Sequence, residues 1–270
     1  AESVLTGIRL GKKLGRLLRL RSEINTEKFI RKKSGKINKR QLHEAAFDAD
    51  DIFFKINTLL FNTASLHITV DASSSMKGPK WNQTMTAVVA ICKAASMANN
   101  IHVTVSFRTT FSDHVQDLPY VVLAYDSNVD KFSKVKQLFP FLSPYGCTPE
   151  GLAIEAIMNS FVSISTDVSD RYFLNLSDGE PFFVIRHATA TSKAYSGNVA
   201  VAHTKSQIKK VRQRGMEVLS YFISDNDMSL SNKLKTDFAE MYGSSAEFIN
   251  VNSVVELSRT MNKKFLSKPI

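Results

Sequence analysis

The chain has 270 residues, 43% of them hydrophobic, which is enough to bury one large domain or one domain with an extension. It carries 35 Lys and Arg against 25 Asp and Glu, a net charge of +10. No apolar stretch approaches the roughly 20 residues that cross a bilayer, so we expect no membrane span. Cys92 and Cys147 lie in no spacing that would hold zinc, and we expect a soluble cytoplasmic protein.

The positive charge is concentrated near the start of the chain. Residues 1–40 hold 13 Lys and Arg against three acids, which accounts for the whole excess, while the other 22 basic and 22 acidic residues balance. We therefore expect residues 1–50 to form a basic extension and residues 51–270 to form the main domain. The extension could bind nucleic acid, an anionic membrane or an acidic protein, or it could be a solvated basic face on packed elements.

The first predicted element is a helix over Ser3–Arg21, where apolar residues recur at helical spacing with basic residues between them. Gly7, Gly11 and Gly15 recur every four residues on this helix. The many basic residues argue against dimerisation of a membrane helix. The glycines therefore indicate close packing on another element of the protein.

The next segment, Glu27–Leu42, has two short basic runs on either side of Ser34-Gly35, a dipeptide typical of turns. We expect a β-hairpin here. The basic extension would then combine a helix with a hairpin.

Strand-like and helix-like runs alternate through the rest of the chain. The predicted strands are Ile52–Leu60, Leu66–Val70, Ile101–Phe107, Tyr120–Tyr125, Arg171–Leu176, Glu217–Ile223 and Glu247–Val251. The predicted helices are Trp81–Ala98, Val129–Leu138, Pro149–Phe161, Thr204–Arg214, Ser229–Tyr242 and Ser253–Phe265. Such alternation predicts an α/β fold, a three-layer α/β/α sandwich with a doubly wound, mostly parallel sheet. Phe182–His203 interrupts the rhythm, so we expect an insertion near the functional edge.

The loop after strand Leu66–Val70 carries the first candidate ligands. Asp71, Ser73 and Ser75 alternate along this loop, and ligands bind at the carboxyl ends of strands in doubly wound folds. Carboxylate and hydroxyl oxygens suit Mg²⁺ or Mn²⁺ and are poor ligands for zinc. The alternative is that Asp71 caps the following helix and the serines satisfy the backbone of the turn.

Two later segments make the pattern specific. Gly146-Cys147-Thr148-Pro149 precedes a predicted helix, and Ser177-Asp178-Gly179 ends a predicted strand. Together with the first loop they resemble the metal-ion-dependent adhesion site of the von Willebrand factor A family. The resemblance implies Mg²⁺, or Mn²⁺, bound directly by Ser73, Ser75 and Thr148 and partly through water by Asp71 and Asp178. It also implies that the strands ending at Asp71 and Asp178 lie side by side. Thr148 before Pro149 could instead serve as a helix N-cap.

A closer resemblance covers nearly the whole chain. LHITVDASSSMKG at residues 66–78 and the later SDGEP resemble the CobT-type subunits of cobaltochelatase, an enzyme of cobalamin biosynthesis. Such a subunit is a protein-binding adaptor that acts with a AAA+ ATPase of the CobS or MoxR type and with a chelatase large subunit or another target protein. Two features depart from that pattern: Ser74 stands where the family has glycine, and no long acidic tract precedes the domain.

Two other functions have to be weighed. A metal-dependent hydrolase is disfavoured because the six histidines are scattered and no nucleophile and base stand at motif spacing. His67 and His102 fall in predicted strands, where a core role is favoured. Nucleic-acid binding through residues 1–40 is the other candidate, although that segment has little aromatic residue content beyond Phe29. We expect no catalytic activity of the chain on its own.

Overall fold

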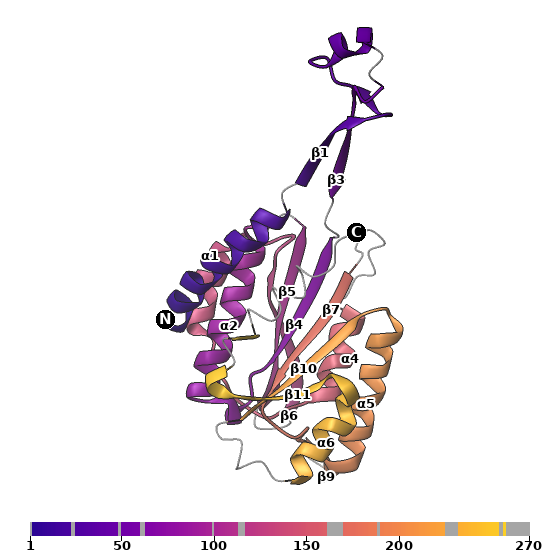
Figure 1. Cartoon of the computed structure of the whole chain (residues 1–270). Helices are drawn as coiled ribbons and strands as arrows, with labels where there is room; N and C mark the ends of the chain where they lie inside the picture. The colour runs from indigo at the N-terminus through magenta and orange to yellow at the C-terminus, as the bar shows by residue number, and fades with distance from the viewer. Residues whose placement is uncertain are drawn as a thin grey trace.

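The computed structural model describes residues 2–22, 25–47, 50–59, 63–98, 100–112, 117–160, 170–187, 190–224, 232–253 and 256–257. Figure 1 shows an α/β body and an arm, residues 25–59, that projects from one end of it. Among the described helices, none is long and apolar enough to cross a bilayer. The last predicted helix, Ser253–Phe265, falls almost entirely outside the described residues.

Six strands form the central sheet of the body. In spatial order they are β11 (Ala246–Asn250), β10 (Glu217–Ser224), β7 (Asp170–Ser177), β4 (Ala64–Asp71), β5 (Ile101–Ser112) and β6 (Asp117–Asp126). Neighbouring strands run parallel except β6, which is antiparallel to β5. The central strands β4 and β7 are buried over most of their length, as expected for strands covered on both faces.

Helices cover both faces of the sheet (Figure 1). One face is covered by α2 (Pro79–Ala95) and α3 (Ser133–Leu138), with α1 (Glu2–Ser22) packed on α2. The other face is covered by α4 (Glu150–Ser160), α5 (Gly197–Gln213) and α6 (Asn232–Tyr242). Each face has its own cluster of buried apolar side chains, because the strands alternate their side chains between the two faces. The predicted three-layer α/β/α fold with a mostly parallel sheet is confirmed.

Helix α1 packs tightly against α2. A Cβ atom on Gly7 would lie 2.7 Å from the carbonyl oxygen of Thr86, and one on Gly11 would lie 2.6 Å from that of Ala90. Glycine lets the two backbones approach this closely, which confirms the predicted role of the repeated glycines. Because Leu14 is also buried in the core, α1 is part of the body, unlike the separate extension expected from its charge.

The arm is a three-stranded antiparallel sheet. It contains β1 (Asn25–Lys32), β2 (Lys36–Ile37) and β3 (Phe53–Leu59) in the order β1-β3-β2, and a short 3-10 helix over Leu42–Phe47. The predicted hairpin is wrong in its pairing, because β1 and β2 each pair with β3 and not with each other. Since β1 and β2 are both basic, placing the mainly apolar β3 between them separates their like charges. The arm also continues past residue 50, where we expected the extension to end.

The predicted insertion at 182–203 contains a hairpin and the start of a helix. β8 (Phe183–His187) pairs antiparallel with β9 (Ala190–Tyr195), and α5 then begins at Gly197, well before its predicted start. The Ala- and Ser-rich sequence predicts an insertion, yet Ala200 on α5 is buried in the core. Small side chains can pack closely there, so tertiary contact decides the start of this helix.

Candidate metal site

The predicted ligands lie at the carboxyl-terminal edge of the sheet. Asp71 is the last residue of β4, and Asp178 directly follows β7. These two strands pair in parallel, with Val70 opposite Leu176, so their ends lie side by side as predicted. Parallel pairing thereby brings together two carboxylates that are 107 positions apart in the sequence.

Backbone hydrogen bonds hold the loop of Thr148 against the loop that follows β4. The Tyr145 amide donates to the carbonyl oxygen of Ala72 at 2.7 Å, and the Ser74 amide donates to that of Gly146 at 3.0 Å. Gly146 has a φ of +79°, a conformation that favours glycine. The glycine two positions before Thr148 therefore lets the chain turn so that the threonine reaches the site.

The five predicted ligands form a continuous chain of hydrogen bonds. Asp71 Oδ1 accepts from the Ser73 amide (2.8 Å), the Ser73 and Ser75 hydroxyl oxygens lie 2.9 Å apart, and the Ser75 hydroxyl donates to Asp178 Oδ1 (2.7 Å). The Thr148 hydroxyl donates to the other Asp71 oxygen at 3.2 Å. Asp71 is fully buried while Ser75 is exposed, so the group opens to solvent beside Ser75.

Space and donor chemistry both fit a hard divalent cation. A Cβ atom on Gly179 would lie 3.4 Å from the Thr148 hydroxyl oxygen and 3.8 Å from that of Ser75, so glycine keeps open the space between these two donors. Within the described residues no group of three or more His, Cys, Asp or Glu side chains is arranged so that it could hold a metal ion by itself. A metal here would therefore need the hydroxyl oxygens, a donor set that suits Mg²⁺ or Mn²⁺ better than zinc.

Lys80 is a neighbour of the site that the sequence motif does not include. Its ammonium nitrogen lies 2.7 Å from Asp178 Oδ2, and the lysine side chain is only 15% exposed. Lys80 is in the first turn of α2, where a positive charge is opposed by the helix dipole. In the sequence, a lysine at the start of a predicted helix is the signal that could have indicated an acidic side chain nearby.

A buried polar network lies directly beneath the ligands. Glu150 and Arg108 form an ion pair with a nitrogen–oxygen distance of 3.0 Å, and both side chains are fully buried. The Glu150 carboxylate also accepts from the Asn175 amide nitrogen at 2.9 Å and from the Tyr242 hydroxyl. These residues come from β5, α4, β7 and α6, so the network ties four elements together below the site.

Ser177 connects this network to the ligands. Its hydroxyl oxygen lies 3.1 Å from Asp71 Oδ2 and 3.2 Å from Glu150 Oε2. The single hydroxyl proton can serve one carboxylate at a time. The two carboxylates therefore share one donor. A change in the charge of either carboxylate alters which of them accepts this hydrogen bond.

The electrostatic state of Asp71 reflects this crowded setting. Burial raises the pKa of Asp71 to about 6, Arg108 opposes the shift, and the carboxylates of Glu150 and Asp178 add to it. A raised pKa means that the folded protein holds the Asp71 carboxylate at a free-energy cost. A cation at this position would reduce that cost.

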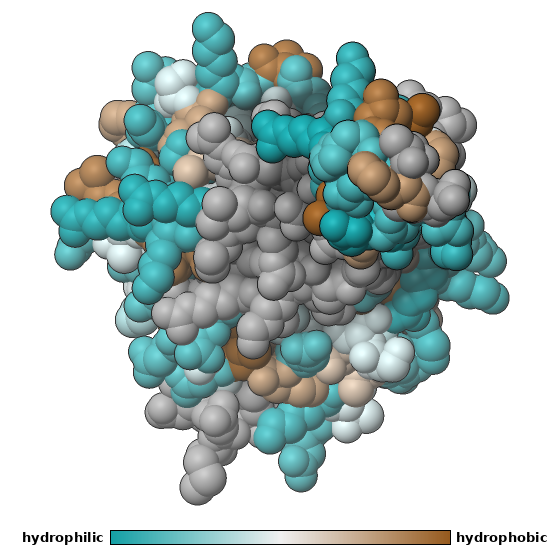
Figure 2. Space-filling view, turned by 45° about the horizontal axis from the view of Figure 1, so that its top comes forward, coloured by the Kyte–Doolittle hydropathy of each residue, from teal (hydrophilic) through white to brown (hydrophobic). Residues whose placement is uncertain are grey.

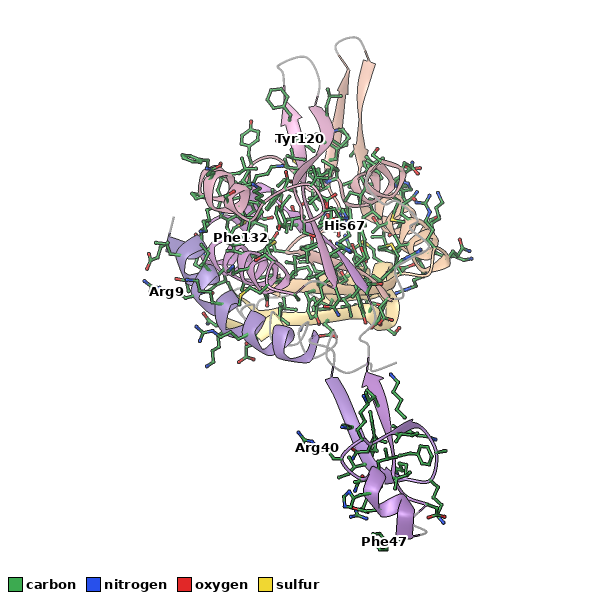
Figure 3. The ribbon with its side chains drawn as sticks, turned by 90° about the horizontal axis from the view of Figure 1, so that it is seen from above. Arg9, Arg40, Phe47, His67, Tyr120 and Phe132 are labelled. Carbon is green, nitrogen blue, oxygen red and sulfur yellow. The ribbon has the colours of Figure 1, made fainter. Side chains whose placement is uncertain are left out.

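His67 belongs to the core, as the sequence indicated. It lies in β4 at the centre of the body (Figure 3), its Nε2 is 2.9 Å from the Ser106 hydroxyl oxygen, and its ring stacks on Phe173. Burial lowers the pKa of His67 to about 3, which keeps the ring neutral at ordinary pH. We assign it a packing role.

No protein-family model and no curated protein matches the sequence. Solved structures do match it. The vWF domain of the type V pili tip protein Mfa5 from Porphyromonas gingivalis aligns with a TM-score of 0.56 and 9% identity, over 76% of this chain and 95% of that one. The chain has the von Willebrand factor A fold.

Two further structures are similar over most of the chain. The open conformation of the pilus adhesin SpaC from Lactobacillus rhamnosus GG aligns with a TM-score of 0.56 and 14% identity over 79% of this chain. The chain spans 32% of the length of that adhesin. A manganese-loaded Plasmodium vivax TRAP protein aligns with a TM-score of 0.47 and 16% identity, over 77% of this chain and 75% of that one, and the manganese is a property of that protein. At 14% identity the likeness to SpaC shows the fold alone.

Proposed function

We propose that the chain is a metal-dependent protein-binding module. The observation that carries this proposal is the chain of hydrogen bonds that links Asp71 through Ser73 and Ser75 to Asp178 across the ends of two neighbouring strands. The residues that would hold Mg²⁺ or Mn²⁺ are Asp71, Ser73, Ser75, Thr148 and Asp178. When bound, the cation supplies a positive charge and an exchangeable coordination position for a carboxylate of a partner protein.

Charge at the site supports an acidic contact in the loaded protein. Asp71, Asp178 and Glu150 contribute three negative charges when ionised, and Arg108 and Lys80 contribute two positive charges. These charges sum to a net charge of −1 at the site, and a divalent cation would change the net charge to +1. The attraction of a partner carboxylate is then strongest where the interface excludes water.

Exposed aromatic side chains around the Thr148 loop support a protein partner. Tyr145 is 55% exposed and Phe182 is 47% exposed. Phe182 lies beside the Thr148 loop, because its amide donates to the carbonyl oxygen of Thr148 at 3.0 Å. Aromatic side chains next to a polar anchor are typical of protein interfaces.

The finer assignment rests on the sequence resemblance alone. We propose that this module acts as the CobT-type subunits do, with a AAA+ ATPase partner, in metal chelation or in the remodelling of another protein complex. Cys92 and Cys147 are both free thiols, which supports the reducing cytoplasm as its compartment.

The experiment that tests the proposal measures the binding of the metal and the binding of the partner protein on the same variants. Mn²⁺ binding is followed by electron paramagnetic resonance, and retention of the native partner on immobilised protein is compared in Mg²⁺ and in chelator. We expect Thr148→Ala to lose both, with an unchanged circular dichroism spectrum. The matched control is Thr236→Ala, at an exposed threonine of α6, which should lose neither. Full partner retention by a folded Thr148→Ala protein that binds no Mn²⁺ would overturn the proposal.

A further inference from the structure

The arm stands apart from the metal site. It joins the body beside the start of β4, whereas Asp71 lies at the end of that strand (Figure 1). Figure 3 places Arg40 and Phe47 on the part of the arm that lies away from the body. A partner of the arm could therefore bind without touching the metal site.

Three acidic side chains of the arm form ion pairs with two of its basic side chains. Arg31 lies 3.5 Å from Glu44 and 3.2 Å from Asp51, and Lys33 lies 2.8 Å from Asp50. These pairs are on the surface and are screened by salt. Within the residues that the structure describes, Lys28, Lys39 and Arg40 take part in none of these three pairs.

These three cations line one pocket. Lys28 comes from β1, and Lys39 and Arg40 follow β2. The pocket has a volume of about 650 Å³, and its other lining residues are Ile30, Ile37, Asn38 and Phe54. Among the lining residues that the structure describes, none is acidic. The pocket thus combines three positive charges with apolar side chains, which suits a ligand with anionic and flat apolar parts.

Aromatic rings accompany the positive charge. The Lys28 ammonium lies 4.1 Å from the centre of the Phe54 ring, and Phe29 is 40% exposed. Phe47 is 84% exposed at the end of the short 3-10 helix. In the space-filling view hydrophobic and hydrophilic side chains lie next to one another on the arm, at the upper right (Figure 2).

We propose that the arm binds nucleic acid. Lys28, Lys39 and Arg40 would contact the phosphate backbone, and the exposed aromatic rings would stack on bases. The shape of the arm fits this role, because its longest strand pair, β1 with β3, forms an antiparallel ribbon, and the major groove of duplex DNA admits a two-stranded β-ribbon. Phe47 is placed as an apolar side chain that inserts between bases.

The aromatic rings favour nucleic acid over an acidic protein. Carboxylates of a protein would satisfy the three cations, but carboxylates have no planar face for Phe47 or Phe54. Every nucleotide combines a phosphate with a flat base, so it matches both features of the arm at once. The proposal does not depend on the metal site.

The test uses two triple variants of equal net charge. In the arm variant Lys28, Lys39 and Arg40 are replaced by glutamine, and in the control Arg9, Lys12 and Lys13, exposed on α1, are replaced by glutamine. Binding of a fluorescent 30-base-pair duplex, the matching single strand, a poly-glutamate peptide and phosphatidylserine vesicles is measured in chelator over a series of salt concentrations. Thermal melting shows that each variant is folded.

We expect the arm variant to bind DNA at least about tenfold more weakly than the wild type. The slope of log affinity against log salt should also fall by about three units, one for each phosphate that the protein no longer neutralises. The slope of the control should fall by less than one unit. Phe47→Ala should weaken binding with an unchanged slope, because phenylalanine carries no charge.

The comparison of duplex with single strand identifies the form of nucleic acid that the arm prefers. Equal weakening in both triple variants would overturn the proposal, since it would show that the positive charge acts without regard to its position. Tighter binding of poly-glutamate or of vesicles than of DNA would overturn it as well.

Discussion

Replacing Glu150 by glutamine should destabilise the protein strongly, although the change keeps the shape of the side chain. Arg108 would keep its charge while its ion-pair partner becomes neutral, and both side chains are fully buried. Four donors converge on the Glu150 carboxylate, from Arg108, Ser177, Asn175 and Tyr242. The single oxygen of a glutamine cannot accept all of these hydrogen bonds.

The size of the effect follows from this burial. Breaking a buried ion pair by removing one partner costs about 3–5 kcal/mol, and the nearby Asp71 carboxylate partly compensates Arg108, so we expect about 3 kcal/mol. For a domain of this size such a loss lowers the melting temperature by about 6–12 °C. The matched control is Glu155→Gln in the same helix, where the glutamate is 43% exposed and 3.6 Å from His203. The control should lose less than about 1 kcal/mol.

Urea unfolding of the two variants and of the wild type gives the free energies directly. If the loss comes from an unpaired Arg108, the double variant Arg108→Met/Glu150→Gln should regain part of the stability lost by Glu150→Gln. A Glu150→Gln protein within about 1 kcal/mol of Glu155→Gln would show that the buried pair contributes no more than an exposed one, and it would refute the reasoning.

Three other predictions concern the site and the packing of α1. Lys80→Met should tighten Mn²⁺ binding about tenfold in calorimetry, because a tethered cation no longer competes for Asp178. In chelator, the free energy of unfolding should fall by about 2 kcal/mol as pH rises from about 4 to 6, since folded Asp71 binds its proton with a pKa of about 6 against an ordinary value of 3.8. Gly11→Ala should cost about 1–3 kcal/mol in urea unfolding, because the new Cβ would lie 2.6 Å from the Ala90 carbonyl oxygen.

Each of these predictions has a matched control. Lys77→Met removes an equal charge from an exposed position just before α2 and should change Mn²⁺ affinity less than Lys80→Met does. Asp71→Asn removes the titrating group, so its stability should lack the fall between pH 4 and 6 that the wild type shows. Lys13→Ala, on an exposed position of α1, should leave stability within about 0.5 kcal/mol of the wild type. Equal effects of variant and control would contradict the corresponding explanation.

Local patterns in the sequence were sufficient for the fold class and for the order of the candidate ligands. The apolar runs of β4 and β7 predict buried parallel strands, and Asp71 and Asp178 directly follow those runs. Ligands bind where such strands end, so the sequence alone predicts that the two carboxylates lie at the ligand-binding edge of the sheet. The repeat of Gly7 and Gly11 likewise predicted close helix packing before its partner was known.

Only the tertiary structure decided the groups that surround the ligands. Arg108 and Glu150 lie 42 positions apart, and their meeting depends on how β5 and α4 pack beside the central strands. The pairing of β1 and β2 with β3 was hidden for a similar reason, because a turn signal at Ser34-Gly35 shows that the chain reverses but not which strand lies next to it. Spacing along the chain determines local geometry, whereas sheet order and helix packing determine which distant charges become neighbours.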